Sequence, residues 1–183
     1  MYNSAIASIL LTLLVGCGAS KPLQLELNYS SDNRSTNNGI GKCSEVFYFS
    51  DQRKNKTLGQ MSGQAVLADT TIYSWINQAF MHEFGNKVKL IKLSPKVNQN
   101  VKWVIELKKA YVMNQTTNMA ATSVFKLRKT SKAFKQVFRG NITHSNWNSS
   151  TAETIKVLNS ALRDGLGRMK ESLSTICRGE NLV

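Results

Sequence analysis

The apolar residues of this chain change their spacing sharply near residue 145, and this change limits the folds that the chain can adopt. From Val101 to Thr143 they recur at every second position, as in strands that bury one face. After Ser150 they recur at steps of three or four, as along one face of a helix: Ile155, Leu158, Leu162, Leu166, Met169, Leu173 and Ile176. This order predicts that a long C-terminal helix covers the apolar face of a sheet.

The period-two region predicts three successive antiparallel strands, joined by polar turns at Asn114 to Asn118 and at Lys129 to Lys132. One face of these strands is apolar. The other face is basic, and its candidate binding residues are Lys102, Lys108, Lys126, Arg128, Lys135 and Arg139. Glu106 points to the same side as Lys102 and Lys108.

The part of the chain before residue 95 predicts smaller elements. Strands are expected over Leu23 to Tyr29 and Glu45 to Ser50, with a short strand around Val88, Leu90 and Leu93. Between them, a helix capped by Thr70 or Thr71 and ended by Gly85 has an apolar stripe, which we interpret as core: Ile72, Trp75, Ile76, Ala79, Phe80 and Phe84.

These elements predict one α+β domain, in which a central helix and the long C-terminal helix pack on one face of an antiparallel sheet. Residues 30–41 are expected to form a polar loop. Ser150 or Thr151 caps the last helix, with Glu153 near its positive end. Gly165 and Gly167 lie inside this helix and indicate a close crossing or a kink.

The N-terminus has the pattern of a secretory signal. The uncharged apolar run from Ala5 to Val15 is followed at once by small residues. A permanent membrane span needs about 20 apolar residues, so this shorter run is expected to be removed. The alternative is that the run belongs to a buried helix and that Cys17 is an ordinary core thiol.

Leu14 to Cys17 resembles the lipobox of bacterial lipoproteins. The resemblance implies a signal peptide over residues 1–16, a lipidated anchor and tether over 17–22, and a periplasmic domain over 23–183. Cys17 would carry a diacylglyceryl group and an N-acyl chain, and no other cofactor is expected. In the family, an aspartate after the lipidated cysteine favours retention in the inner membrane. Gly18 stands at that position and favours the outer membrane.

Three cysteines are an odd number for an exported protein. Lipidation of Cys17 leaves Cys43 and Cys177 as a candidate disulfide, which an oxidising compartment favours. The alternative is two separate buried thiols. Neither cysteine has a second ligand at metal-binding spacing, so no metal site is predicted.

The formal net charge is +13, from 24 Lys and Arg against 11 Asp and Glu. In a cytosolic protein this charge would suggest nucleic acid as the partner, but export makes nucleic acid an unexpected one. The polyanions of the envelope are anionic lipid, lipopolysaccharide and peptidoglycan, and an envelope protein complex is a further candidate partner. The alternative is that the charge only keeps a tethered domain soluble.

Residues with catalytic potential are sparse. His82 and His144 are isolated, and no metalloprotease, serine-hydrolase or phosphate-loop motif is present. We therefore expect a protein that is not an enzyme. An envelope hydrolase would need a cleft that brings Asp51 next to a histidine. Asp51 and Arg53, at the end of the second predicted strand, are interpreted instead as a polar clasp.

The lipobox, the Asp51-x-Arg53 strand end, Leu58-Gly59 and the order of elements together resemble the YajG family of outer-membrane lipoproteins. The resemblance implies a periplasm-facing domain without catalytic residues. We expect a non-enzymatic binding or assembly-support module that contacts anionic envelope components through its basic sheet face. The alternative is an auxiliary lipoprotein of a lipid-trafficking ABC transport system, which needs an apolar groove between helix and sheet.

Overall fold

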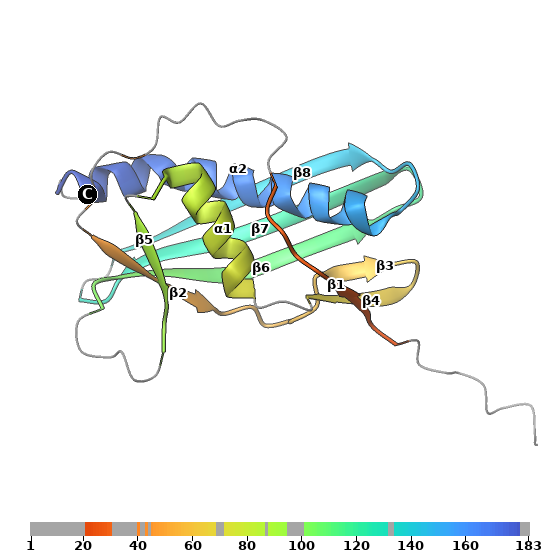
Figure 1. Cartoon of the computed structure of the whole chain (residues 1–183), viewed down its shortest axis with the longest axis horizontal. Coiled ribbons are helices and arrows are strands. Elements are labelled where there is room, and N and C mark those ends of the chain that lie inside the picture. The colour runs from red at the N-terminus through yellow and green to blue at the C-terminus, as the bar shows by residue number, and fades with distance from the viewer. Residues whose placement is uncertain are drawn as a thin grey trace, which may run out of the picture.

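The computed structural model describes residues 21–30, 40, 43, 45–68, 72–86, 88–94, 101–131 and 134–179. The chain forms a single α+β domain, as the sequence predicts (Figure 1). Its elements in chain order are β1 (Leu23–Leu25), β2 (Val46–Asp51), β3 (Gly59–Met61), β4 (Gln64–Ala68), α1 (Ile72–Phe84), β5 (Lys89–Lys92), β6 (Trp103–Asn114), β7 (Asn118–Lys129), β8 (Lys135–Ser145) and α2 (Thr151–Cys177).

The three longest strands form the antiparallel meander that the period-two pattern predicts. β6 pairs with β7 and β7 pairs with β8, so Leu107, Phe125 and Phe138 lie in one row across the sheet. All three side chains are buried under the helices. A register shift between Leu107 and Lys109 marks a bulge, which inserts Lys108 as an extra residue on the opposite face.

The expectation of an antiparallel sheet is wrong for the remaining pairings except that of β3 with β4, because the sheet is mixed. β2 runs parallel to both of its neighbours, β5 and β6, and β3 is parallel to β6. β1 pairs with β4, also in parallel. Alternation along a strand reports which face is buried and carries no information about the direction of its neighbour. The chain returns from β2 to β5 through α1, and such a crossover brings two strands together in parallel.

The N-terminal strands also differ from the prediction. β1 ends at Leu25 instead of Tyr29, and the hairpin of β3 and β4 was not predicted. Gly59 begins β3 with a φ of 132°, and a Cβ atom there would overlap the backbone oxygen of Val112. A glycine is therefore required where β3 approaches β6.

Both helices lie on the same face of the sheet (Figure 1). α1 ends at Gly85, which has a φ of 78° and donates its N–H to the carbonyl of Met81. Its predicted caps, Thr70 and Thr71, lie outside the described residues. At the start of α2, Ser150 and Glu153 form a capping box.

α2 crosses the meander closely at one point. A Cβ atom on Gly140 of β8 would overlap the backbone of Ala161 and Gly165. Ser123 of β7 donates its hydroxyl to the carbonyl of Ala161 at 2.8 Å at the same place. Gly165 therefore marks a close crossing, whereas Gly167 faces open space.

Cys43 and Cys177 form a disulfide, with 4.7 Å between their Cα atoms. It joins the segment before β2 to the last residue of α2. Within the described residues, no helix is both long enough and apolar enough to span a membrane.

Candidate binding surface

Several basic side chains lie around one carboxylate on the side of the meander that faces away from the helices. Glu106 of β6 contacts Lys108 (Nζ to Oε2, 2.9 Å), Arg128 (Nε to Oε1, 2.7 Å) and, at 3.8 Å, Lys126. Lys126 and Arg128 come from β7, two residues apart on the same face, and the bulge places Lys108 beside them. Three of the six predicted basic residues are thus brought together.

Glu106 is only 7 % exposed, although it lies on the open side of the sheet. The three basic side chains that contact Glu106 are themselves partly exposed. Burial alone would raise the pKa of the carboxyl, but hydrogen bonds from Lys108 and Arg128 and their charges outweigh it and lower the pKa below its ordinary value. Glu106 is therefore ionised at neutral pH and holds the three cations in place.

Lys135 and Arg139 of β8 extend this group across the third strand. Lys135 lies opposite Arg128 in the register, and Arg139 lies opposite Val124. Both are exposed, and neither has an ion-pair partner within the described part of the chain. Between them, Val137 is 50 % exposed. We call the five residues of this group the outer cationic face: Lys108, Lys126, Arg128, Lys135 and Arg139.

Lys102, the sixth predicted residue, does not contact Glu106 and forms an ion pair with a different carboxylate, that of Glu45, which precedes β2. The sequence placed Glu106 on the basic side, but its role as the centre of the cations was not predicted. A lone acid among alternating basic residues is the signal that could have identified it.

Asp51 and Arg53 form a clasp at the end of β2. The guanidinium of Arg53 makes two hydrogen bonds to the carboxylate of Asp51, of 3.0 and 3.1 Å, and Lys56 lies 3.1 Å from the same carboxylate. Burial would raise the pKa of Asp51, but the hydrogen bonds from Arg53 and Lys56 outweigh it, and the pKa is lowered. A carboxylate held in this way is a poor general base.

The two histidines do not assemble with Asp51. Nδ1 of His82 lies 3.2 Å from the carboxylate of its neighbour Glu83, and its ring packs edge-on against Tyr29. His144 lies in β8 and lines a separate hollow. No group of three His, Cys, Asp or Glu residues arranged to hold a metal ion occurs among the described residues.

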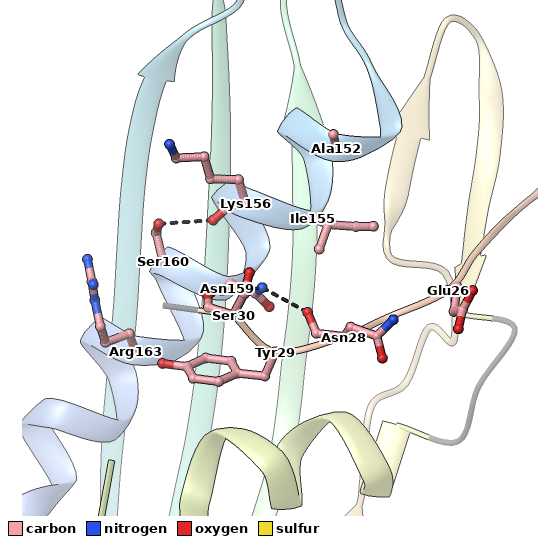
Figure 2. Close-up of a pocket in the computed structure, with 10 residues that line it drawn as sticks. All are labelled: Glu26, Asn28, Tyr29, Ser30, Ala152, Ile155, Lys156, Asn159, Ser160 and Arg163. Carbon is pink, nitrogen blue, oxygen red and sulfur yellow. Dashed lines mark hydrogen bonds between the residues drawn. The ribbon is translucent and has the colours of Figure 1, made fainter. Parts of the chain in front are cut away.

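A hollow of about 340 Å³ lies between α2 and the segment that follows β1 (Figure 2). Asn159 closes its floor by donating to the carbonyl of Asn28 at 3.0 Å. Tyr29 donates its hydroxyl to Glu83 at 2.6 Å, and burial together with this bond raises the pKa of the phenol. The hollow is lined by Glu26, Asn28, Tyr29, Ser30, Ala152, Ile155, Lys156, Asn159, Ser160 and Arg163. This lining has no paired nucleophile and base.

The predicted lipidation residue Cys17 and the sorting residue Gly18 lie outside the described residues. Lipidation and sorting therefore remain predictions from the sequence.

No protein-family model matches this sequence, and no curated protein matches it. Several solved structures are similar in fold. One, an uncharacterised protein, has a TM-score of 0.46 at 9 % identity and covers 87 % of this chain and 98 % of its own. A provisionally assigned lipoprotein from Caulobacter crescentus CB15 has a TM-score of 0.37 at 10 % identity, over 59 % of this chain and 81 % of its own. A dodecameric PelC variant from Paraburkholderia phytofirmans has a TM-score of 0.35 at 13 % identity, over 68 % and 90 %.

Proposed function

We propose that this protein is a lipid-anchored envelope lipoprotein of the outer membrane. Its domain would face the periplasm and bind an anionic envelope component through the outer cationic face, without catalysis and without a cofactor. The single observation that carries the binding part is the surplus of cations on that face, where three basic side chains surround one buried carboxylate and two more, on β8, have no ion-pair partner in the described part of the chain.

The anchor part of the proposal rests on the sequence. The short apolar run of residues 5–15, the lipobox-like Leu14 to Cys17 and the residue Gly18 support export, lipidation at Cys17 and sorting to the outer membrane. Stable anchoring needs two or more acyl chains, and the diacylglyceryl and N-acyl groups of this modification supply them. The resemblance to the YajG family supports the same location.

The position of the outer cationic face supports a binding role. Both helices pack on the other side of the sheet, so no described helix covers this face. A sheet face that only maintains solubility would not need its cations held at fixed positions. Here Glu106 fixes Lys108, Lys126 and Arg128, which reduces the entropy lost when they meet phosphate or carboxylate groups.

A lipid-transport accessory, the alternative function, needs an apolar groove between helix and sheet. In the described residues the corresponding space is filled, since α2 approaches β8 so closely that Gly140 and Gly165 are required. The hollow in Figure 2 has charged side chains at its wall, Glu26, Lys156 and Arg163, which an acyl chain would have to pass. These observations favour the binding module.

The test is sedimentation of the lipidated protein, held in neutral detergent, with purified peptidoglycan sacculi. We expect the K135E/R139E variant to bind at least about tenfold more weakly, because each well-placed cation contributes about 1 kcal/mol near an anionic surface. Competition with lipopolysaccharide or phosphatidylglycerol would show whether phosphate-bearing lipids use the same face.

The matched control is R168E/K170E, which changes the net charge equally on α2, away from the outer cationic face. Equal binding by wild type and K135E/R139E would refute the binding role. Mass spectrometry of the native protein tests the anchor separately. A Cys17 without diacylglyceryl and acyl groups would refute it.

A further inference from the structure

Trp147 is the most exposed large apolar side chain of the described residues, at 86 %. The other two tryptophans of the chain, Trp75 and Trp103, are buried. An exposed indole combines a large apolar ring with a polar N–H group, and tryptophan is enriched where one end of the ring is in an apolar layer and the other is in water.

The loop that carries Trp147 is held firmly. Asn146 donates its amide to Asn114 at 2.7 Å, to the carbonyl of Gln115 at 2.8 Å and to Ser149 at 2.9 Å. The backbone N–H of Trp147 itself donates to the carboxylate of Glu153 at 3.2 Å. The exposure of the indole is therefore fixed by the fold and does not result from a loose loop.

Three turns from distant parts of the sequence meet at the end of the molecule where Trp147 lies. β6 ends there, β7 begins there and β8 ends there, since Asn118 pairs with Ser145. β3 runs parallel to β6, so the β3–β4 turn lies at the same end. Figure 1 shows the β3–β4 turn, the β6–β7 turn and the β8–α2 connection together.

These turns carry no formal charge. Residues 61–64, 113–119 and 144–149 contain no Asp, Glu, Lys or Arg, in a chain whose net charge is +13. Met113 is 49 % exposed there. Trp147 borders a hollow of about 290 Å³, which Met119 and Val157 line together with two charged residues of α2, Glu153 and Lys156. We call residues 61–64, 113–119 and 144–149 the uncharged end.

The chain also begins its fold at the uncharged end. Leu23 pairs with Val66, which pairs with Gly59, which pairs with Val112. Leu23 is thus in the same row of the sheet as Val112, which lies two residues before the end of β6. The residues just before Leu23 run toward the uncharged end. Cys17 precedes Leu23 by six residues. At about 3.5 Å per residue, the distance between Cys17 and Leu23 is no more than about 21 Å.

We propose that the uncharged end lies against the bilayer that holds the lipid anchor, with Trp147 in the interfacial region. The inference rests on the proposed lipidation of Cys17. Tryptophan favours the level of the lipid head groups, where its ring is in an apolar layer and its N–H is still hydrated. A short tether, an exposed indole and three turns without formal charge all favour this orientation.

The orientation separates the two surfaces. Arg128 and Lys135 lie near the other end of the meander, ten residues from Ser145 along β8. At about 3.3 Å per residue, this distance is about 33 Å. Much of the outer cationic face then stands away from the anchoring bilayer and is available to a second partner.

The test places the lipidated full-length protein in vesicles of phosphatidylethanolamine and phosphatidylglycerol with brominated acyl chains, which quench nearby tryptophan. Because Trp75 and Trp103 are buried, the exposed component of the emission reports on Trp147. We expect this component to be largely lost with brominated lipid and to be missing in W147F. In unbrominated vesicles, Trp147 should become protected from a soluble quencher.

The matched control is W147F/V137W, which moves the exposed indole to the outer cationic face. Its new tryptophan should keep its emission in brominated vesicles. If the protein floats with the vesicles and Trp147 is not quenched, or if both positions are quenched equally, the orientation is refuted while the anchor stands. If Cys17 is unmodified by mass and the protein does not float, the anchor and the orientation are both refuted.

Discussion

The indole nitrogen of Trp75 donates a hydrogen bond of 2.8 Å to the side-chain oxygen of Asn159, and both residues are buried. The amide nitrogen of Asn159 donates in turn to the carbonyl of Asn28 at 3.0 Å. One side chain of α2 thereby joins α1 and the segment after β1. Figure 2 shows its bond to Asn28.

Replacing Asn159 should therefore destabilise the whole domain. N159A leaves the indole N–H of Trp75 without its partner in the core, and we expect the free energy of unfolding to fall by about 2 to 3 kcal/mol. Urea unfolding followed by circular dichroism measures the change. S160A removes only a hydrogen bond within α2 and should stay within about 0.5 kcal/mol of wild type. Equal effects of the two substitutions would contradict the role of Asn159.

The close crossing of α2 over β8 predicts opposite effects for two Gly-to-Ala changes. In G140A the new methyl group overlaps the backbone of Ala161 and Gly165, and a backbone shift of this kind costs about 1 to 3 kcal/mol or more. In G167A the methyl group meets nothing, and helix propensity favours alanine by up to about 1 kcal/mol. Thermal unfolding of both variants should show the melting temperature falling in the first and holding or rising in the second. A stable G140A protein would mean that the crossing is looser than described.

The Cys43–Cys177 disulfide closes a loop with a sequence separation of 134 residues. In the chain-entropy account, a loop of that length restricts the unfolded chain enough to contribute about 4 to 5 kcal/mol. We expect C43S/C177S to lose stability by up to this amount in urea unfolding, and wild type to match it once a reductant is added. Two free thiols in protein isolated from an oxidising compartment would contradict the link.

Glu106 makes the stability of the domain depend on pH in the acid range. Its pKa in the folded protein is lower than its ordinary value of about 4.3, so its ionised form stabilises the fold above that pH. This contribution is lost as the pH falls through the lowered pKa. Between neutral pH and about pH 3, wild type should therefore lose more free energy of unfolding than E106Q does. Parallel curves for the two proteins would exclude this linkage.

The same substitution tests the outer cationic face. E106Q removes the one carboxylate among the five cations, and we expect this gain of positive charge to outweigh the loss of fixed side-chain positions. Sacculi should then bind E106Q more tightly than wild type at a pH where the variant is folded. Weaker binding would mean that the positions of Lys108, Lys126 and Arg128 matter more than their charge.

Much of the fold follows from local patterns. The meander, both helices, Gly85 as the end of α1 and Ser150 with Glu153 as a cap all depend on residues within a few positions of one another. The strand directions do not. β5 runs parallel to β2 because the chain returns through α1 before it enters β5, and β6 is parallel to β2 on the other side. The β3–β4 hairpin depends on its fit beside β6. These pairings join distant segments, and neither strand alone specifies its partner.

The candidate binding surface could also be predicted only in part from the sequence. By itself, the sequence determined which side of each long strand is basic, because this is a property of residue type and spacing. It also predicts a pair of Cys43 with Cys177 and lipidation at Cys17. Only the tertiary structure decided that Glu106 is the centre of the cations and that Lys102 lies outside them. It also brought the three uncharged turns and Trp147 to the end where the chain enters the fold. Such groupings arise because strand register places residues from different segments in the same row of the sheet.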